Sequence, residues 1–270
     1  MPIADSTKKA YDSYLTRLQT LSGGASLLNV PKMIETVEGI RKGGTTPISA
    51  GTKKNYYIAL FNNAKESPEV AAKYREKFMT INKATAPPTP PEPNIMPWAE
   101  LQVAGFAIMQ SDDPLEHRIL AGLVTQLPPM RLDYTNLTVF TKASPPPADF
   151  TGNYVYLKSP KMSQLVVQEH KTASTYGTLT RKIPEPIYRL ILQWKKVNPD
   201  TPLLAMTPNV LGRLITRIFM KHTGKPVTMN DLRHSYVSAA RAGDRKLSEV
   251  RRIAAELGHS ILMNEAYRRD

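Results

Sequence analysis

Five side chains between residues 131 and 267 have the types that bind and attack a phosphodiester. Two are arginines, Arg131 in Pro-Pro-Met-Arg-Leu-Asp-Tyr and Arg233 in Asn-Asp-Leu-Arg-His, and a third is Lys171 in Glu-His-Lys-Thr-Ala-Ser. The last two are His259 in Leu-Gly-His-Ser and Tyr267, eight residues further on. Guanidinium groups donate paired hydrogen bonds to phosphate oxygens, and a tyrosine hydroxyl can act as a nucleophile. The set therefore indicates a phosphate clamp with a nucleophile.

The order of these residues resembles the catalytic series of the tyrosine recombinase (phage-integrase) family. That series runs Arg, Lys, Arg-His, Leu-Gly-His-Ser and Tyr, and these members occur here in the same order. The residues around Arg131 and Lys171 are similar to those of integrases from mobile elements and DNA viruses. The resemblance covers essentially the whole chain, and it implies a helical core-binding domain followed by a mixed α/β catalytic domain.

The resemblance also implies a role for each residue. Arg131, Arg233 and His259 would hold the scissile phosphate, whose negative charge grows on the nonbridging oxygens during attack. Tyr267 would attack the phosphorus and form a 3′-phosphotyrosyl bond, and Lys171 would protonate the leaving 5′-oxygen. Because this ester keeps the energy of the broken bond, the strands can rejoin without ATP, a metal ion or any other cofactor.

Each residue also has a purely structural explanation. An arginine can pair with a nearby carboxylate, which gives the pairs Arg131–Asp133 and Arg233–Asp231. A lysine in a turn is usually solvated, Gly258 followed by a histidine is an ordinary helix stop, and the last tyrosine can anchor a terminal helix by its ring. A shared family origin explains all five positions at once, so we prefer it.

Two positions depart from the family pattern. Asn230 stands where the family has a histidine, three residues before the second arginine. Since asparagine cannot accept the tyrosine proton, the base is left open between His234 and His259. Tyr134 stands where the family often has an acidic residue, so an orienting role for Asp133, one residue earlier, is also left open.

The end of the chain departs as well. The interval from the histidine to Tyr267 is eight residues, one fewer than is usual in the family, and three residues follow the tyrosine. Related proteins continue into a segment that docks on a neighbouring protomer. We therefore expect either a truncated chain or an assembly held by other contacts.

Other kinds of active site have little support in the sequence. It has no P-loop, no Gly-x-Gly-x-x-Gly fingerprint and no cysteine, and its five histidines form no i, i+4 pair. The acidic cluster Asp112, Asp113 and Glu116 lies beside Ser111 within one turn, where helix capping and the helix dipole explain it. We expect no metal site.

Charge and proline content predict two domains that bind a polyanion. The 270 residues carry a net charge of +13, with a pI of about 9.8. Between Pro87 and Pro97, six of eleven residues are proline, which favours an extended linker. We expect a core-binding domain at 1–85, a linker at 86–97 and a catalytic domain at 98–270. The two domains carry charges of +6 and +8, and nucleic acid is the simplest partner.

Apolar periodicity predicts a mainly α fold with a small antiparallel sheet, of the α+β class. The first domain should contain four helices, at about 6–22, 31–41, 52–64 and 68–79. The second should contain two helices within 98–126 and, after Pro184, helices near 187–194, 211–218, 229–242, 247–257 and 263–269. A three-stranded antiparallel meander is expected at 153–157, 164–168 and 176–183.

The sequence therefore predicts a site-specific DNA recombinase that closes around double-stranded DNA as a C-shaped clamp. Lys53, Lys54 and Tyr57 on one predicted helix, with Lys182, are candidate DNA contacts, although Tyr57 fits a core position equally well. By resemblance, four protomers would act on two sites, with a monomer or weak dimer when DNA is absent. No membrane partner is expected, and the protein would reside where its DNA lies, in a bacterial cytoplasm, a host nucleus or a viral factory. The alternatives are a catalytically silent DNA-binding protein and a topoisomerase-like or resolvase use of the same chemistry.

Overall fold

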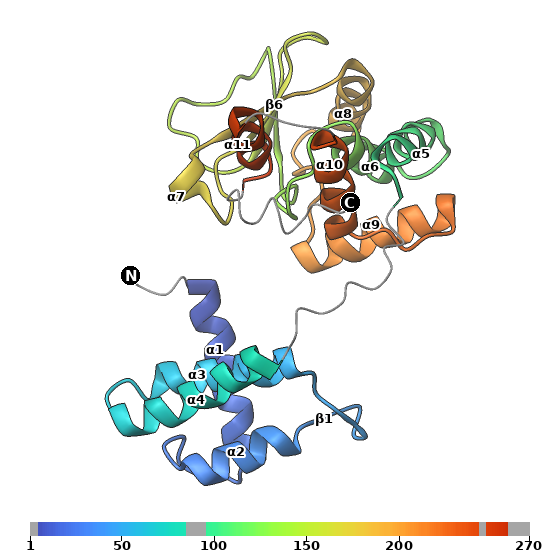
Figure 1. The fold of residues 1–270 in the computed structure, drawn as a ribbon. Helices are drawn as coiled ribbons and strands as arrows, with labels where there is room; N and C mark the ends of the chain where they lie inside the picture. The colour runs from blue at the N-terminus through green and yellow to red at the C-terminus, as the bar shows by residue number, and fades with distance from the viewer. Residues whose placement is uncertain (1–4, 85–95, 243–246, 259–270) are drawn as a thin grey trace. The chain divides into compact units, whose positions relative to one another are not determined.

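The computed structural model describes residues 5–84, 96–242 and 247–258 (Figure 1). The chain divides into two compact units, residues 1–93 and 94–270. Met96 is buried in the core of the second unit, and Pro97 lies directly before its first helix. The rest of the predicted linker, 86–95, lies outside the described residues. In the described part of the chain, no helix is long and apolar enough to cross a membrane.

The first unit is helical, as predicted. Its helices are α1 (Asp5–Leu21), α2 (Val30–Gly39), α3 (Ala50–Asn63) and α4 (Pro68–Ala84). Asn29 and Ser49 cap α2 and α3, because each side chain accepts a backbone N–H three residues on. Tyr56, Tyr57 and Tyr74 are fully buried between the helices. Aromatic side chains thus supply much of this small core.

A short hairpin between α2 and α3 was not predicted. The expected helix at 31–41 ends at Gly39, and β1 (Arg41–Lys42) then pairs antiparallel with β2 (Thr46–Pro47). Gly43 and Gly44 both have positive φ and form the turn. These glycines do not simply stop a helix, because they turn the chain back on itself.

The second unit combines a small sheet with helices, most of which gather on one side of it (Figure 1). Its helices are α5 (Trp98–Gln110), α6 (Leu115–Thr125), α7 (Ala173–Tyr176), α8 (Glu185–Val197), α9 (Pro208–Thr223), α10 (Met229–Ala240) and α11 (Leu247–Glu256). The predicted helix at 263–269 lies outside the described residues. Helix α6 packs against α5, α8 and α9, so it lies at the centre of the helical layer.

The sheet has one strand more than predicted. The order is β3 (Thr138–Thr141), β4 (Tyr154–Leu157), β5 (Gln164–Val167) and β6 (Leu179–Lys182). Strands β4, β5 and β6 form the predicted antiparallel meander. Strand β3 pairs parallel with β4, so the prediction of a purely antiparallel sheet was wrong. The mainly α, α+β fold class is confirmed.

Helices α5 and α6 approach each other closely at Gly105. A β-carbon there would lie 1.9 Å from Oγ1 of Thr125, which is itself fully buried and donates to the Ala121 carbonyl. Only glycine fits at this crossing.

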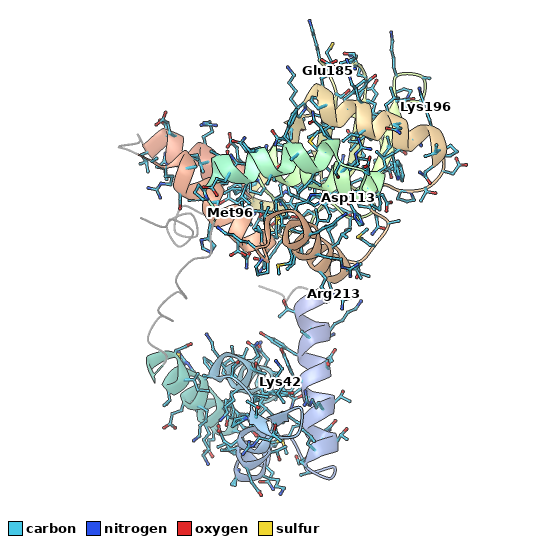
Figure 2. All side chains as sticks on the ribbon, turned by 90° about the vertical axis from the view of Figure 1, so that its right-hand side faces the viewer. Lys42, Met96, Asp113, Glu185, Lys196 and Arg213 are labelled. Carbon is cyan, nitrogen blue, oxygen red and sulfur yellow. The ribbon has the colours of Figure 1, made fainter. Side chains whose placement is uncertain are left out.

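Asp113 joins the α5–α6 loop to the end of α9 (Figure 2). Its buried carboxylate accepts hydrogen bonds from Lys221 and from Nε2 of His222, the latter at 2.7 Å. The capping explanation offered for Asp113 was therefore wrong, whereas Glu116 does lie in the first turn of α6. In the described chain, no group of three or more His, Asp or Glu side chains is arranged to hold a metal ion.

Replacing Asp113 with asparagine is expected to destabilise the protein by about 2 kcal/mol at neutral pH, because hydrogen bonds to charged partners are lost. Burial alone would raise the pKa of Asp113, but the bonds and charges of Lys221 and His222 outweigh it and lower that pKa. The stabilisation is thus present above the ordinary value of 3.8 and is lost as pH falls through the lowered value. Urea unfolding at several pH values measures the effect, and Asp112→Asn, at the exposed neighbour, should change little.

Candidate active site

Arg131 lies in an irregular loop between α6 and β3. The loop is closed by Tyr134, which is fully buried and whose hydroxyl accepts the backbone N–H of Met130 at 3.0 Å. Arg131 is part-buried and donates from its guanidinium to the Gly258 carbonyl at 3.5 Å. Arg131 and Asp133 are both described, and they form no ion pair with each other. The purely structural explanation for Arg131 was therefore wrong.

Asn153 connects this loop to the chain that carries Lys171. Its amide nitrogen donates to the carbonyls of Asp133 (3.2 Å) and Glu169 (2.9 Å). Its amide oxygen accepts the backbone N–H groups of Gln168 (2.9 Å) and Glu169 (2.8 Å). One side chain at the start of β4 therefore holds the loop before β3 against the end of β5.

Lys171 is exposed in the connection between β5 and β6, where the sequence places it. The residues beside it hold the connection in shape. His170 makes hydrogen bonds through Nε2 to the Gly177 carbonyl (2.8 Å) and through Nδ1 to the Thr172 hydroxyl (3.2 Å). The lysine is thus free to extend outwards from a well-supported turn.

Arg233 is fully buried on α10. It donates to the carbonyls of Pro129 (3.1 Å) and Leu257 (3.4 Å). Asp231 instead caps the helix, because Thr228 and Asp231 form a reciprocal capping box. The structural alternative of an Arg233–Asp231 pair is therefore wrong, and Arg233 instead contacts the Pro129 carbonyl in the loop that carries Arg131.

The carbonyl groups of Glu256, Leu257 and Gly258, here called the α11 carbonyl end, bring these segments together. Besides Arg131 and Arg233, they accept from Arg181 and from the Thr172 hydroxyl, the latter at 2.6 Å. A helix C-terminus carries partial negative charge, so it attracts arginines. Gly258 ends the helix at φ +61°, which confirms it as a helix stop. His259 is the next residue along the chain, and it lies outside the described residues, as does Tyr267.

Asp133 sits within the field of the site's cations. Burial raises the pKa of this carboxyl above its ordinary value of 3.8, more than the charges of His170, Arg131 and Arg233 lower it. In the folded state the charged carboxylate is therefore unfavourable on balance, even with arginines nearby.

Replacing Asp133 with asparagine is expected to raise stability modestly at neutral pH, because the buried charge is removed. A raised carboxyl pKa means that the wild-type protein loses stability as pH rises from 3.8 through the folded value. The gain in the variant should therefore vanish below pH 3.8. Urea unfolding across this range measures it, and a variant less stable than wild type at neutral pH would contradict the sign.

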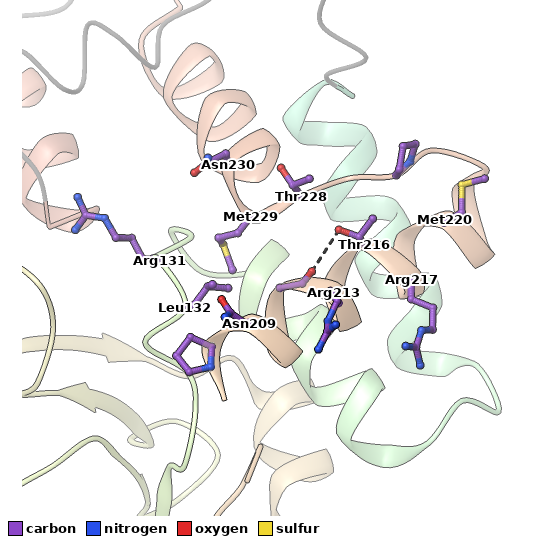
Figure 3. A pocket seen from close by; sticks show the side chains of 13 residues that line it. Arg131, Leu132, Asn209, Arg213, Thr216, Arg217, Met220, Thr228, Met229 and Asn230 are labelled. Atoms are coloured by element: carbon purple, nitrogen blue, oxygen red, sulfur yellow. Dashed lines mark hydrogen bonds between the residues drawn. The ribbon is translucent and has the colours of Figure 1, made fainter. Parts of the chain in front are cut away.

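A cleft of about 830 Å³ opens beside Arg131 (Figure 3). Its walls are the Arg131 loop, the side of α9 and the N-terminal residues of α10, which include Asn230. Asn230 is exposed and His234 is half-buried. The position of the family histidine therefore faces the cleft, with an amide in place of the imidazole.

The four candidate DNA contacts differ in how exposed they are. Tyr57 is fully buried and donates to Glu38 at 2.9 Å, which confirms it as a core residue and removes it from the DNA-binding set. Lys53 pairs with the same Glu38, and Lys54 is half-buried. In the second unit, Lys182 is exposed on the edge strand β6.

A basic groove in the first unit was missed by the sequence analysis. Arg17, Arg41 and Lys42 line a groove of about 600 Å³ that also reaches Ser49 at the N-terminus of α3. These cations come from α1 and the short hairpin, which lie far apart in the sequence. No local charge run in the sequence marks them as one surface.

Comparison with known proteins finds similar folds but no similar sequence. No family model and no curated protein matches the sequence. The structure is similar to a lambda integrase dimer bound to a COC′ core site, with a TM-score of 0.58, 16% identity, and coverage of 100% of this chain and 73% of that chain. It is also similar to XerA recombinase, with a TM-score of 0.45, 16% identity, and coverage of 99% and 88%. At 16% identity the likeness to lambda integrase is one of fold, so the resemblance carried by single residues extends to the fold.

Proposed function

We propose that the protein is a tyrosine recombinase that cuts and rejoins DNA strands through a covalent 3′-phosphotyrosyl intermediate. The observation that carries the proposal is the convergence of Arg131, Arg233 and the Lys171 turn at the α11 carbonyl end, directly before His259. This convergence occurs within the fold of lambda integrase. Arg131 and Arg233 are more than a hundred positions apart in the sequence, and their contacts with the same helix end support the proposal.

The scissile phosphate would be held by the two arginines. Their hydrogen bonds to the carbonyls of Leu257 and Gly258 are long, at 3.4 and 3.5 Å, and therefore weak. Phosphate oxygens carry full charge and accept shorter, stronger bonds from a guanidinium. Because Arg233 is buried, its contact with the phosphate requires the Leu257–Gly258 segment to give way. Phosphate binding would thus exchange carbonyl partners for anionic ones.

Other residues would carry out the nucleophilic attack and the proton transfers. Tyr267 would attack the phosphorus, and the phosphate would stay linked to it while the 5′-oxygen leaves with a proton from Lys171. His259 would donate to a nonbridging oxygen, and Asn230 would add a neutral hydrogen bond from the cleft wall. Since Asn230 cannot take a proton, we assign the base for Tyr267 to His259 or His234.

The first unit would hold DNA through Lys53, Lys54 and the basic groove of Arg17, Arg41 and Lys42. Such contacts reach phosphates and not base edges, so they supply affinity and position without reading sequence. With the catalytic unit, they would keep the duplex bound while one strand is cut. In this proposal, four protomers act together on two DNA sites.

The test is a search for a covalent protein–DNA complex with chelator present. Duplexes selected by binding from a randomised pool supply the substrate, and a nick beside the cleaved phosphate lets the short product leave. Trypsin should then release a nucleotide-linked peptide 253–268, whose single tyrosine is Tyr267. The cut strand should carry a free 5′-hydroxyl, as a 3′-linkage requires. Selected duplexes that bind tightly but never form an adduct would favour the silent DNA-binding protein.

A further inference from the structure

An arginine pair on α9 is not used by the chemistry above. Arg213 and Arg217 are four residues apart, so they lie on one face of the helix, and both are exposed. Figure 3 shows the two side chains next to each other and extending to the same side of α9. Both line the cleft that Arg131 also lines. The pair therefore extends the positive surface away from the site of cleavage.

Neither arginine is neutralised within the described part of the protein. Their guanidinium groups have no hydrogen-bond or ion-pair partner among the described residues, in contrast to Arg189, which pairs with Glu185. The described cleft walls include no aspartate or glutamate. Like charges four residues apart destabilise a helix, so the pair weakens the isolated protein. An anionic ligand would remove this repulsion.

The other residues of the cleft indicate which kind of anion would bind there. The N-terminus of α10 opens into it at Thr228 and Asn230, which adds positive potential. Leu132, Met220 and Met229 give it an apolar wall. A free phosphate ion has no apolar group to pack against this wall, whereas the sugars of a polynucleotide strand can pack against it. Four helical residues advance about 6 Å, which is comparable to the distance between successive phosphates along one DNA strand, so the pair can contact two phosphates of the same strand.

We propose that Arg213 and Arg217 bind two backbone phosphates of the DNA strand whose scissile phosphate is held by Arg131. This inference rests on the proposed function and deepens it, because it assigns the path of the cut strand along α9. The pair would position the strand and take no part in bond breaking. DNA binding would then depend on ions released from these phosphates as well as from the scissile one.

The test compares two double variants of equal charge loss in the full chain. Arg213→Ala with Arg217→Ala removes the pair, and Lys195→Ala with Lys196→Ala removes two cations from α8. Figure 2 shows Lys196 and Arg213 at well-separated places on the unit. For the α9 variant, the slope of log affinity for duplex DNA against log salt should fall by about 2, and affinity should drop about tenfold or more. The α8 variant should keep the wild-type slope. The thermal midpoint of the α9 variant should be no lower than that of wild type, since a like-charge pair is removed.

Three outcomes would overturn the inference. The first is equal salt slopes for the two alanine variants. The second is a reduced salt slope in the lysine variant Arg213→Lys with Arg217→Lys, which keeps both charges. The third is saturation by inorganic phosphate that blocks DNA binding at matched ionic strength, which would indicate a free-anion site. Failure of the proposed function is distinguishable, because wild type would then form no adduct while the α9 variant still showed the reduced slope.

Discussion

Replacement of Tyr267 by phenylalanine is expected to abolish covalent attachment to DNA and to leave DNA affinity within about twofold of wild type. The change removes one oxygen, and that oxygen is the proposed nucleophile. No other group can replace it at the phosphorus without forming a different linkage. Denaturing electrophoresis of labelled nicked duplex measures the adduct, and a filter or anisotropy assay measures binding.

The tyrosines of the described structure near the site are poor rivals to Tyr267. Tyr134 is fully buried, and burial raises its pKa to about 12. Tyr236 donates its hydroxyl to Oε2 of Glu256 at 2.7 Å, and burial together with this carboxylate raises its pKa as well. Tyr267 lies nine residues after Gly258, a length of chain that spans up to about 30 Å, so it can reach the arginines from the α11 carbonyl end.

Tyr176 provides the matched control for this prediction. It lies on α7, five residues after Lys171, and it is half-buried. Tyr176→Phe should form the adduct at the wild-type rate. Loss of the adduct in Tyr176→Phe, with the adduct retained in Tyr267→Phe, would move the nucleophile to α7 and overturn the assignment.

Helices with one apolar face were predictable from the sequence. In α8, Ile187, Leu190, Ile191 and Trp194 recur at helical spacing, and all four are buried as that spacing requires. Strands β4, β5 and β6 are as short as β3, but turn signals separate them in the sequence. Strand β3 was missed because its parallel partner begins only after a twelve-residue connection, with no hairpin turn to mark the pair. The β1–β2 ladder is shorter still. Periodicity reports burial on one side, so elements without such a face escape it.

The candidate site residues were proposed from the sequence, but the groups that support them in the fold were not. The order of Arg131, Lys171 and Arg233 carries the resemblance, because the groups that would contact the phosphate can be identified by residue type. Asn153 has no local signal, because its role is to join two loops that meet only in the folded chain. The burial of Arg233 was equally hidden. An arginine in an amphipathic helix is normally expected at the surface, whereas here it lies beneath the loop that it supports.

Replacing Arg233 with lysine is expected to slow adduct formation by about 10²- to 10³-fold, the usual cost of losing one oxyanion donor. Lysine keeps the charge, but a single ammonium cannot donate in parallel to two phosphate oxygens. It also cannot reach Pro129 and Leu257 in the way that the two guanidinium nitrogens do, so a stability loss of about 1–2 kcal/mol should accompany the change. Non-specific DNA affinity should barely change, because many other phosphate contacts share it.

Arg181 separates the chemical effect of Arg233 from a structural one. It donates to the Glu256 carbonyl, one residue before the carbonyl that Arg233 contacts, so it also fixes the α11 carbonyl end. Unlike Arg233, it is not a member of the catalytic series. Arg181→Lys should therefore cost similar stability while retaining most of the adduct rate. If both variants slowed adduct formation equally at matched stability, the buried arginine would act only by holding α11, and the phosphate would have to be held by Arg131 without it.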